Sequence, residues 1–296
     1  MYAGPYRSHA DLRWFTSANV TPVTQSFPVT IWSYWDCGLA NAPEIVRLCV
    51  ASWRKFAVGA DIAVLDEDSL FNYLEPQDLP VRFDELRVQH QSDFIRLALL
   101  ARHGGVWMDA SIFLTQPLLH WIGEIASDCG LFLFRRPGPD REFANWFIVA
   151  KRQHGFILAL KKGLEDLFAI PRIHSKGGLR REGMGVLWKL LLKFSTKSSF
   201  LASLWTREPL RRLKAFPYHI FHYFGNRLVR QPKHKAAFES MEWIPADYGH
   251  YLSRTFSKTG ELSMESLALA PSPVNKLKVR ACYSDIDLGR LRATLQ

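Results

Sequence analysis

The chain has 296 residues, of which 48% are hydrophobic, and a formal net charge of +10 at pH 7. This length and composition allow a sizeable core and exclude a wholly disordered protein, and no apolar run approaches the roughly 20 residues that a membrane-spanning helix needs. The positive charge favours anionic partners, such as nucleotide diphosphates, phospholipid head groups or nucleic acid, without choosing among them.

The first 115 residues predict alternating strands and helices. Residues 1–27 are polar and irregular, and we expect them to form an N-terminal arm. The elements predicted next are a buried strand over 28–35, a helix over 43–56, a strand over 61–66 and a short helix over 70–74. A further helix and strand follow in the stretch 92–117. This alternating order favours a parallel or mainly parallel sheet flanked by helices.

The stretch 92–117 predicts a capped helix, a glycine break and a buried strand. Ser92 suits the N-cap of the helix, and Gly104 suits the position just after its end. Residues 106–108 are uniformly apolar, as expected for a strand covered on both faces. Asp109 follows at the strand exit, which is where open α/β sheets bind ligands.

Beyond residue 117 the sequence predicts further strands over 130–136 and 144–152, helices over 156–168 and 186–194, and a strand or turn around 275–283. Between residues 187 and 216 seven basic residues stand against one acidic residue. They are Lys189, Lys193, Lys197, Arg207, Arg211, Arg212 and Lys214. We call this group the basic segment.

Several segments resemble one known family. The shared pattern is S-D-x-x-R, an apolar helix, then G-G, an aromatic strand and D-x-D or D-x-S. The matching segments here are Ser92–Arg96, Gly104–Ser111, the opening strand and turn Ile31–Pro43, and the weaker blocks Asn145–Phe147 and Asn275–Leu277. On these residues the chain resembles the capsular polysaccharide synthesis family, which is related to the Och-type mannosyltransferases of yeast and the large clostridial glucosylating toxins.

The resemblance implies a GT-A fold: an α/β, mainly parallel Rossmann-type sheet flanked by helices, with a helical and aromatic-rich C-terminal lobe. It also implies a UDP- or GDP-sugar donor and transfer to a growing surface or capsular polysaccharide, with retention of anomeric configuration. The expected organisation is the arm over 1–27, a nucleotide-sugar-binding core over 28–150, and residues 151–296, which complete the core and form an acceptor-side lobe.

Asp109 and Ser111 are the candidate metal ligands. On an extended chain, side chains two residues apart point the same way and can share one ligand. Hard oxygen ligands suit Mg²⁺ or Mn²⁺ bridging a diphosphate, where the ion stabilises the leaving nucleotide. Ser111 stands where the relatives usually have a second aspartate, so this D-x-S motif carries one negative charge less and is expected to bind metal more weakly.

Asp93 and Arg96 are three residues apart, so they share one helix face and can pair. The resemblance implies that they hold the hydroxyls of the donor sugar and act, with Asp109, as the catalytic residues. The alternative from the residues alone is a helix-capping aspartate with a structural salt bridge.

Five further residues are candidates for donor binding. Trp32, or alternatively Trp35, could stack on the nucleobase, although either could be a core residue. Asp66, at the end of the second strand, could meet the ribose or base or cap a helix. Gly105 belongs to the G-G motif. Lys276 is a candidate for diphosphate binding because it lies in the segment Asn275–Leu277, which is similar to a block of the family.

A second metal site is weakly indicated. His219 and His222 form an H-x-x-H motif, which on a helix would share a face. The surrounding segment FPYHIFHYF favours a strand, where the two would point oppositely, so we expect a structural or acceptor-side role. The four cysteines form no C-x-x-C pair, which argues against a zinc or disulfide framework.

Location and competing functions follow from the charge and the termini. The first 15 residues contain no signal-like apolar segment, so we expect a cytoplasmic protein. The resemblance to the capsular polysaccharide synthesis family implies a bacterial one. The basic segment could dock it on the anionic inner membrane, or be an ordinary basic helical face. Two alternatives are a non-catalytic degenerate transferase fold that binds glycan or nucleic acid and a protein-glycosylating transferase. No motif for binding nucleic acid is present, so we expect no such partner.

Overall fold

We analysed a computed structural model of the chain, which describes residues 29–126, 129–169, 190, 193–207 and 218–296. The elements of the first half are β1 (Thr30–Tyr34), α1 (Glu44–Phe56), β2 (Asp61–Leu65), α2 (Val88–Arg102), β3 (Gly105–Met108), β4 (Ile112–Leu114), α3 (Leu118–Ile125), β5 (Leu131–Gly138) and β6 (Arg141–Ala150). Those of the second half are α4 (Gly155–Phe168), α6 (Ser199–Ser203), α7 (Ile220–Leu228), α8 (Pro232–Ser240), α9 (Ala246–Gly249), α10 (Tyr251–Thr259), α11 (Met264–Ala268), β7 (Val274–Lys276) and α12 (Asp285–Ala293).

A five-stranded sheet in the order β2-β1-β3-β6-β5 forms the centre of the fold. β1 pairs in parallel with both β2 and β3, whereas β6 runs antiparallel to β3 and β5. The antiparallel half follows from the two-residue connection between Gly138 and Arg141, which leaves room only for a hairpin. The expected α/β class is confirmed, and β2, β1 and β3 form a parallel half of the kind found in Rossmann-type sheets.

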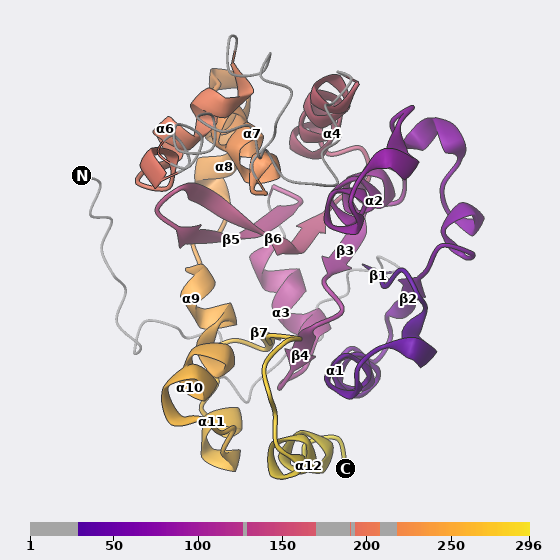
Figure 1. The fold of residues 1–296 in the computed structure, drawn as a ribbon, viewed down its shortest axis with the longest axis vertical. Helices are drawn as coiled ribbons and strands as arrows, with labels where there is room; N and C mark the ends of the chain where they lie inside the picture. The colour runs from indigo at the N-terminus through magenta and orange to yellow at the C-terminus, as the bar shows by residue number, and fades with distance from the viewer. Residues whose placement is uncertain (1–28, 127–128, 170–189, 191–192, 208–217) are drawn as a thin grey trace, which may run out of the picture.

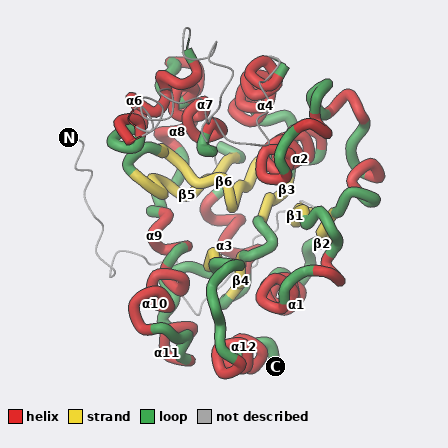
Figure 2. Tube along the Cα trace, viewed as in Figure 1, coloured by secondary structure: helices red, strands yellow, loops and turns green. Residues whose placement is uncertain are grey.

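Helices flank this sheet on two sides. In Figure 1 α2, α4 and α7 lie above the strands, and α1 and α3 lie below them. The same view coloured by secondary structure shows the strands as a band between the helices (Figure 2). Trp107, at the centre of β3, is 1% exposed and stands opposite Trp32 on β1 and Ile148 on β6. Val106 and Met108, whose side chains point to the opposite face, are 0% exposed, so β3 is covered on both faces, as its apolar sequence predicts.

A second, two-stranded sheet fixes the C-terminal part of the chain beside the exit of β3. β4 pairs antiparallel with β7, and Ile112 stands opposite Lys276. Phe113 of β4 belongs to a separate apolar cluster that includes Leu252 of α10 and Leu291 of α12. Residues from the last quarter of the chain thus lie next to the segment that follows β3.

The central stretch has the predicted order but a different start. Helix α2 begins at Val88, so Ser92 lies inside it, and the prediction of Ser92 as N-cap is wrong. The extra turn is stabilised because His90 is buried against Phe168. At the other end, Gly104 follows the C-cap with a φ of 72°, a left-handed conformation that glycine adopts without steric cost, as predicted.

The aromatic segment around residues 218–224 is not a strand, contrary to the prediction. It forms the start of α7, in which His219 is the N-cap. Ile220, Phe221 and Phe224 are spaced as on a helix, and the helix packs on β6, where Gly225 comes close to the ring of Phe143. Burial on the sheet outweighs the β-propensity of the aromatic residues.

Part of the basic segment is described. Lys193, Lys197 and Arg207 are exposed. The arm expected over 1–27, most of the helix expected over 186–194, and the residues Lys189, Arg211, Arg212 and Lys214 lie outside the described residues. Within the part of the chain that the structure describes, no helix is long and apolar enough to cross a membrane.

Candidate active site

A pocket of about 580 Å³ lies where β1 and β3 end. Its wall is formed by the residues after these two strands, the first turns of α2, the middle of β6, the start of α7 and the end of β7. The exits of parallel strands are the expected ligand site of an open α/β sheet. The pocket therefore lies at the place that the sequence predicts.

Asp109, the first residue after β3, accepts hydrogen bonds at both carboxylate oxygens. Oδ2 lies 2.6 Å from Nζ of Lys276, and Oδ1 lies 2.9 Å from Nε1 of Trp107 and 3.3 Å from Nη2 of Arg96. Burial by itself would raise the pKa of the Asp109 carboxyl, but the charges of Lys276 and Arg96 outweigh burial and hold its pKa below the usual range. Asp109 is an ionised group between two cations.

Arg96 joins Asp109 to a second carboxylate. It is 4% exposed, and its Nη1 donates to Asp93, which is 7% exposed and also accepts from Nδ2 of Asn145 at 3.0 Å. The guanidinium carbon lies 5.1 Å from the ring centre of Trp107, so the plane is fixed by packing as well as by charge. The predicted Asp93–Arg96 pair is present, and it is nearly buried.

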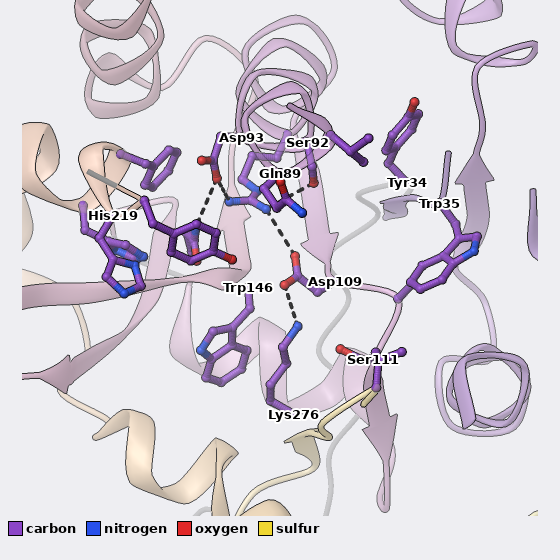
Figure 3. Close-up of a pocket in the computed structure, with 18 of the residues that line it drawn as sticks. Tyr34, Trp35, Gln89, Ser92, Asp93, Asp109, Ser111, Trp146, His219 and Lys276 are labelled. Atoms are coloured by element: carbon purple, nitrogen blue, oxygen red, sulfur yellow. Dashed lines mark hydrogen bonds and ion pairs between the residues drawn. The ribbon is translucent and has the colours of Figure 1, made fainter. Parts of the chain in front are cut away.

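These contacts form one continuous chain across the pocket floor. It runs from Asn145 on β6 through Asp93 and Arg96 on α2 to Asp109 after β3 and Lys276 on β7. Figure 3 shows the dashed lines that join them, with Asp93 on one side of Asp109 and Lys276 on the other. We call this set the polar chain.

Asp109 and Ser111, the predicted metal ligands, both line the pocket, but the chain between them is not extended as the prediction assumes. Asp109–Ser111 is a turn and not an extended segment, because the amide of Ile112 donates to the carbonyl of Asp109 at 2.9 Å, so the premise of two parallel side chains is wrong. Ser111 is 4% exposed. Within the described residues no group of three His, Cys, Asp or Glu side chains could hold a metal ion.

Of the two tryptophans considered for the nucleobase, Trp35 lines the pocket and Trp32 does not. Trp32 is 3% exposed, and its Nε1 donates to the carbonyl of Gly104 at 2.8 Å. In Figure 3 Trp35 stands on the side of the pocket opposite His219. This arrangement separates a core tryptophan from one that can meet a ligand.

Two other predicted donor-binding residues lie outside the pocket wall. Asp66 accepts from the amide and the hydroxyl of Ser69 at 2.9 and 2.6 Å, which closes a turn after β2 and lowers the pKa of Asp66. Gly105 has a φ of 98°, and a Cβ built there would lie 2.4 Å from the carbonyl oxygen of Thr30. Asp66 therefore stabilises a turn, and Gly105 allows β3 to lie close to β1.

The structure brings further residues to the pocket that the sequence reasoning did not assign to the donor site. They are Arg141, Asn145, Trp146, Tyr218, His219 and His222, among others. Asn145 and Trp146 did carry a signal, since they belong to a block similar to the family. His219 and His222 lie with ring centres 5.7 Å apart, and burial lowers the pKa of both, which favours the neutral form of each imidazole.

Known proteins are similar to part of this chain. Glycosyltransferase afumC of Aspergillus fumigatus is 32% identical over 150 residues, which are 44% of this chain and 38% of that protein. O-glycosyltransferase braB of Annulohypoxylon truncatum is 28% identical over 153 residues, which are 44% of this chain and 36% of that protein. Among solved structures, PaToxG glycosyltransferase is similar with a TM-score of 0.33 and 16% identity, over 67% of this chain and 85% of that chain.

The family described as capsular polysaccharide synthesis protein matches residues 13–169, just over half of the chain. The chain belongs to this family, and the resemblance carried by the S-D-x-x-R and G-G motifs is confirmed. The chain spans less than two fifths of the length of the two curated relatives described above. Both of these relatives are fungal proteins, so they give no support to a bacterial origin.

Proposed function

We propose that the protein is a glycosyltransferase that moves a sugar from a nucleotide-sugar donor to a hydroxyl group of a carbohydrate acceptor. The observation that carries this proposal is the polar chain, because it places paired carboxylates and cations at the strand exits in a pocket large enough for such a donor. The chain belongs to a family described as capsular polysaccharide synthesis protein, which supports sugar transfer as the class of reaction.

Each part of the donor has a suitable partner in the pocket. Trp35 offers an aromatic face for the base. Asp93 and Arg96 accept from and donate to the sugar hydroxyls, in a geometry fixed by burial. Lys276 offers positive charge to the diphosphate, and its side chain is 22% exposed.

The reaction balances without an enzymic nucleophile. The acceptor oxygen bonds to the anomeric carbon while the bond from that carbon to the phosphate oxygen breaks. The nucleoside diphosphate leaves with the bonding electron pair, and the acceptor proton passes to the departing phosphate oxygen. Because attack and departure take place on the same face, the anomeric configuration is retained. The positive groups near Asp109 stabilise the charge that develops on the leaving group.

For the acceptor, we propose a growing surface or capsular polysaccharide, which the family description supports. The similar protein braB is named an O-glycosyltransferase, which supports an oxygen atom as the acceptor. Trp146 and His219 line the pocket on the side away from Trp35, and aromatic side chains of this kind suit contact with a sugar ring of the acceptor.

We also propose that the protein docks peripherally on an anionic membrane, where a lipid-linked glycan would be presented. The described part of the basic segment supports this: Lys193 and Lys197 are exposed, and Phe194 and Phe200 beside them are 55% and 54% exposed. Vesicles in which about one third of the lipid is phosphatidylserine should sediment the protein, and neutral vesicles should leave it in the supernatant. Equal recovery in both would contradict docking by charge.

The reaction class is tested by slow hydrolysis of a panel of UDP- and GDP-sugars, with EDTA and with Mn²⁺. We expect the wild type to hydrolyse at least one donor and Asp109→Ala to lose at least about 100-fold in rate, since it removes the residue between both cations. Lys278→Met is the matched control, because Lys278 bonds to Ser257 and does not line the pocket. Absence of both hydrolysis and nucleotide binding would favour a non-catalytic binding protein.

A further inference from the structure

We propose that Lys276 binds the diphosphate of the donor directly and that Arg96 adds positive charge beside it, so that the site works without a divalent metal ion. The proposal rests on the proposed function, because it assumes that the donor is a nucleotide sugar. In this assignment Asp109 is a positioning residue that holds the two cations and is not a metal ligand. It reverses the metal expectation that the D-x-S motif suggests.

The first argument is that the carboxylate of Asp109 is already occupied. Its Oδ2 accepts from Lys276 at 2.6 Å, and its Oδ1 accepts from Trp107 and Arg96. A metal ion bound to Oδ2 would have to stand about 2.1 Å from it. The ammonium group of Lys276 would then be displaced or would lie beside a doubly charged cation. A metal ion and Lys276 therefore compete for the Asp109 carboxylate. Lys276 is always present at the site because it is part of the chain.

The second argument is the number of hard ligands. Mg²⁺ at a phosphate site keeps several waters, binds phosphate oxygens of the substrate and takes one or two carboxylates from the protein. Asp109 and Ser111 are one carboxylate and one buried hydroxyl in a tight turn. Asp93, the next carboxylate of the polar chain, is bound to Arg96 and Asn145. Asp36, after β1, also lines the pocket, but the described residues at the exit of β3 supply one carboxylate, which is already paired with Lys276 and Arg96.

The third argument is that Lys276 is placed to do the work of the ion. An ammonium group has three N–H donors, and Asp109 takes one of them, which leaves two for phosphate oxygens. Lys276 is anchored by the pairing of β7 with β4, and Figure 3 shows it reaching toward Asp109 from the side opposite Asp93. The diphosphate would meet a fixed positive charge at the place where the strands end.

Arg96 supplies the second cation, and it is held rigidly. Its guanidinium carbon lies 5.1 Å from the ring of Trp107 and 5.5 Å from that of Phe221, and its Nη2 donates to Ser92 at 3.3 Å. Its Nε is buried and has no hydrogen-bond partner among the described residues. Arg96 lines the pocket, so its positive charge can stabilise an anion that binds there beside Lys276.

The test is calorimetric binding of UDP and of GDP to the purified protein, once in EDTA and once in Mn²⁺. We expect one of the two nucleotides to bind with dissociation constants that agree within about threefold between the two conditions. Lys276→Met should weaken binding in EDTA at least about tenfold, as loss of a charge-assisted hydrogen bond would. Lys276→Arg should restore most of the affinity, and Lys278→Met, two positions further on, should leave the affinity unchanged.

Thermal unfolding of each variant shows whether it is folded. If Lys276→Met does not fold, the affinity of Lys276→Arg in EDTA decides the test. An affinity that rises more than tenfold with Mn²⁺ would overturn the proposal while leaving the glycosyltransferase assignment intact. So would a folded Lys276→Met variant that binds in EDTA as tightly as the wild type. Absence of nucleotide binding in both conditions would overturn the proposed function as well, so the two failures are distinguishable.

Discussion

Nη2 of Arg96 on α2 lies 3.3 Å from Oδ1 of Asp109 at the end of β3. The same guanidinium donates through Nη1 to Asp93, so one buried cation links two carboxylates that belong to different elements. The helix and the strand exit are thereby locked together at the pocket floor. A group of this kind contributes to stability and to ligand binding at the same time, and the two contributions can be separated by experiment.

Arg96→Met should be strongly destabilising. Removing the cation leaves the nearly buried Asp93 without its guanidinium partner and takes away one of the two cations at Asp109, and breaking a buried pair in this way costs about 3–5 kcal/mol. Lys276→Met should cost less, about 1 kcal/mol or below, because the Lys276 side chain is 22% exposed. Urea unfolding at pH 7 measures both changes in the free energy of unfolding. Equal losses would show that Arg96 is not the structural link that its contacts indicate.

The sequence predicts the α2–β3 part of the site well because its signals are local. Gly104 ends the helix by its left-handed conformation, and the apolar residues 106–108 form a strand covered on both faces. The Asp93–Arg96 pair follows from helical spacing alone. Asp109 is found because it is the first polar residue after such a strand.

The rest of the site depends on contacts that the sequence pattern does not specify. Lys276 reaches Asp109 across 167 positions only because β7 pairs with β4. The turn at Asp109–Ser111 is closed by a backbone hydrogen bond. The sequence pattern does not distinguish such a turn from an extended strand exit. The helix that carries His222 forms because its aromatic residues are buried on β6, and the β-propensity of the same residues points to a strand.

Gly105→Ala should be destabilising by about 2 kcal/mol or more. A φ of 98° is strained for any residue with a Cβ, and the added atom would lie 2.4 Å from the carbonyl oxygen of Thr30 on the neighbouring strand. Gly123→Ala is the control, since nothing lies within 4 Å of its added Cβ and it lies in helix α3. That change should be neutral or stabilising by up to about 1 kcal/mol. Chemical denaturation of both variants decides, and a neutral Gly105→Ala would contradict the close approach.

The free energy of unfolding should fall as the pH is lowered from about 6.5 to about 4. Burial, with the nearby charges of Lys276 and Arg254, lowers the pKa of His250 to about 4. Between this value and the ordinary pKa of histidine, the unfolded chain binds a proton that the folded chain does not. Stability therefore falls toward acid by up to about 1.4 kcal/mol per pH unit for this group. Urea unfolding at pH 7, 6 and 5 measures the slope.

His250→Phe should flatten this pH dependence, because it keeps a ring next to Trp146, at a centroid distance of 5.2 Å in the wild type, and removes the titrating group. Burial also lowers the pKa of His154 and His222, which contribute with the same sign, so the slope should decrease and not vanish. A slope equal to that of the wild type would exclude His250 as a source of acid sensitivity.

Trp35 and Trp32 should separate ligand binding from folding. Trp35→Ala removes the aromatic wall of the pocket and should weaken nucleotide binding by about tenfold, the effect expected when base stacking worth ~1–3 kcal/mol is lost. Trp32→Phe keeps a buried ring but loses the hydrogen bond from Nε1 to the carbonyl of Gly104. It should cost about 1 kcal/mol of stability and leave nucleotide affinity unchanged. Both variants are compared by calorimetry with UDP and GDP and by urea unfolding. If Trp32→Phe weakened binding while Trp35→Ala did not, the base would stack elsewhere than at the exit of β1, and the donor would lie in the pocket in another orientation.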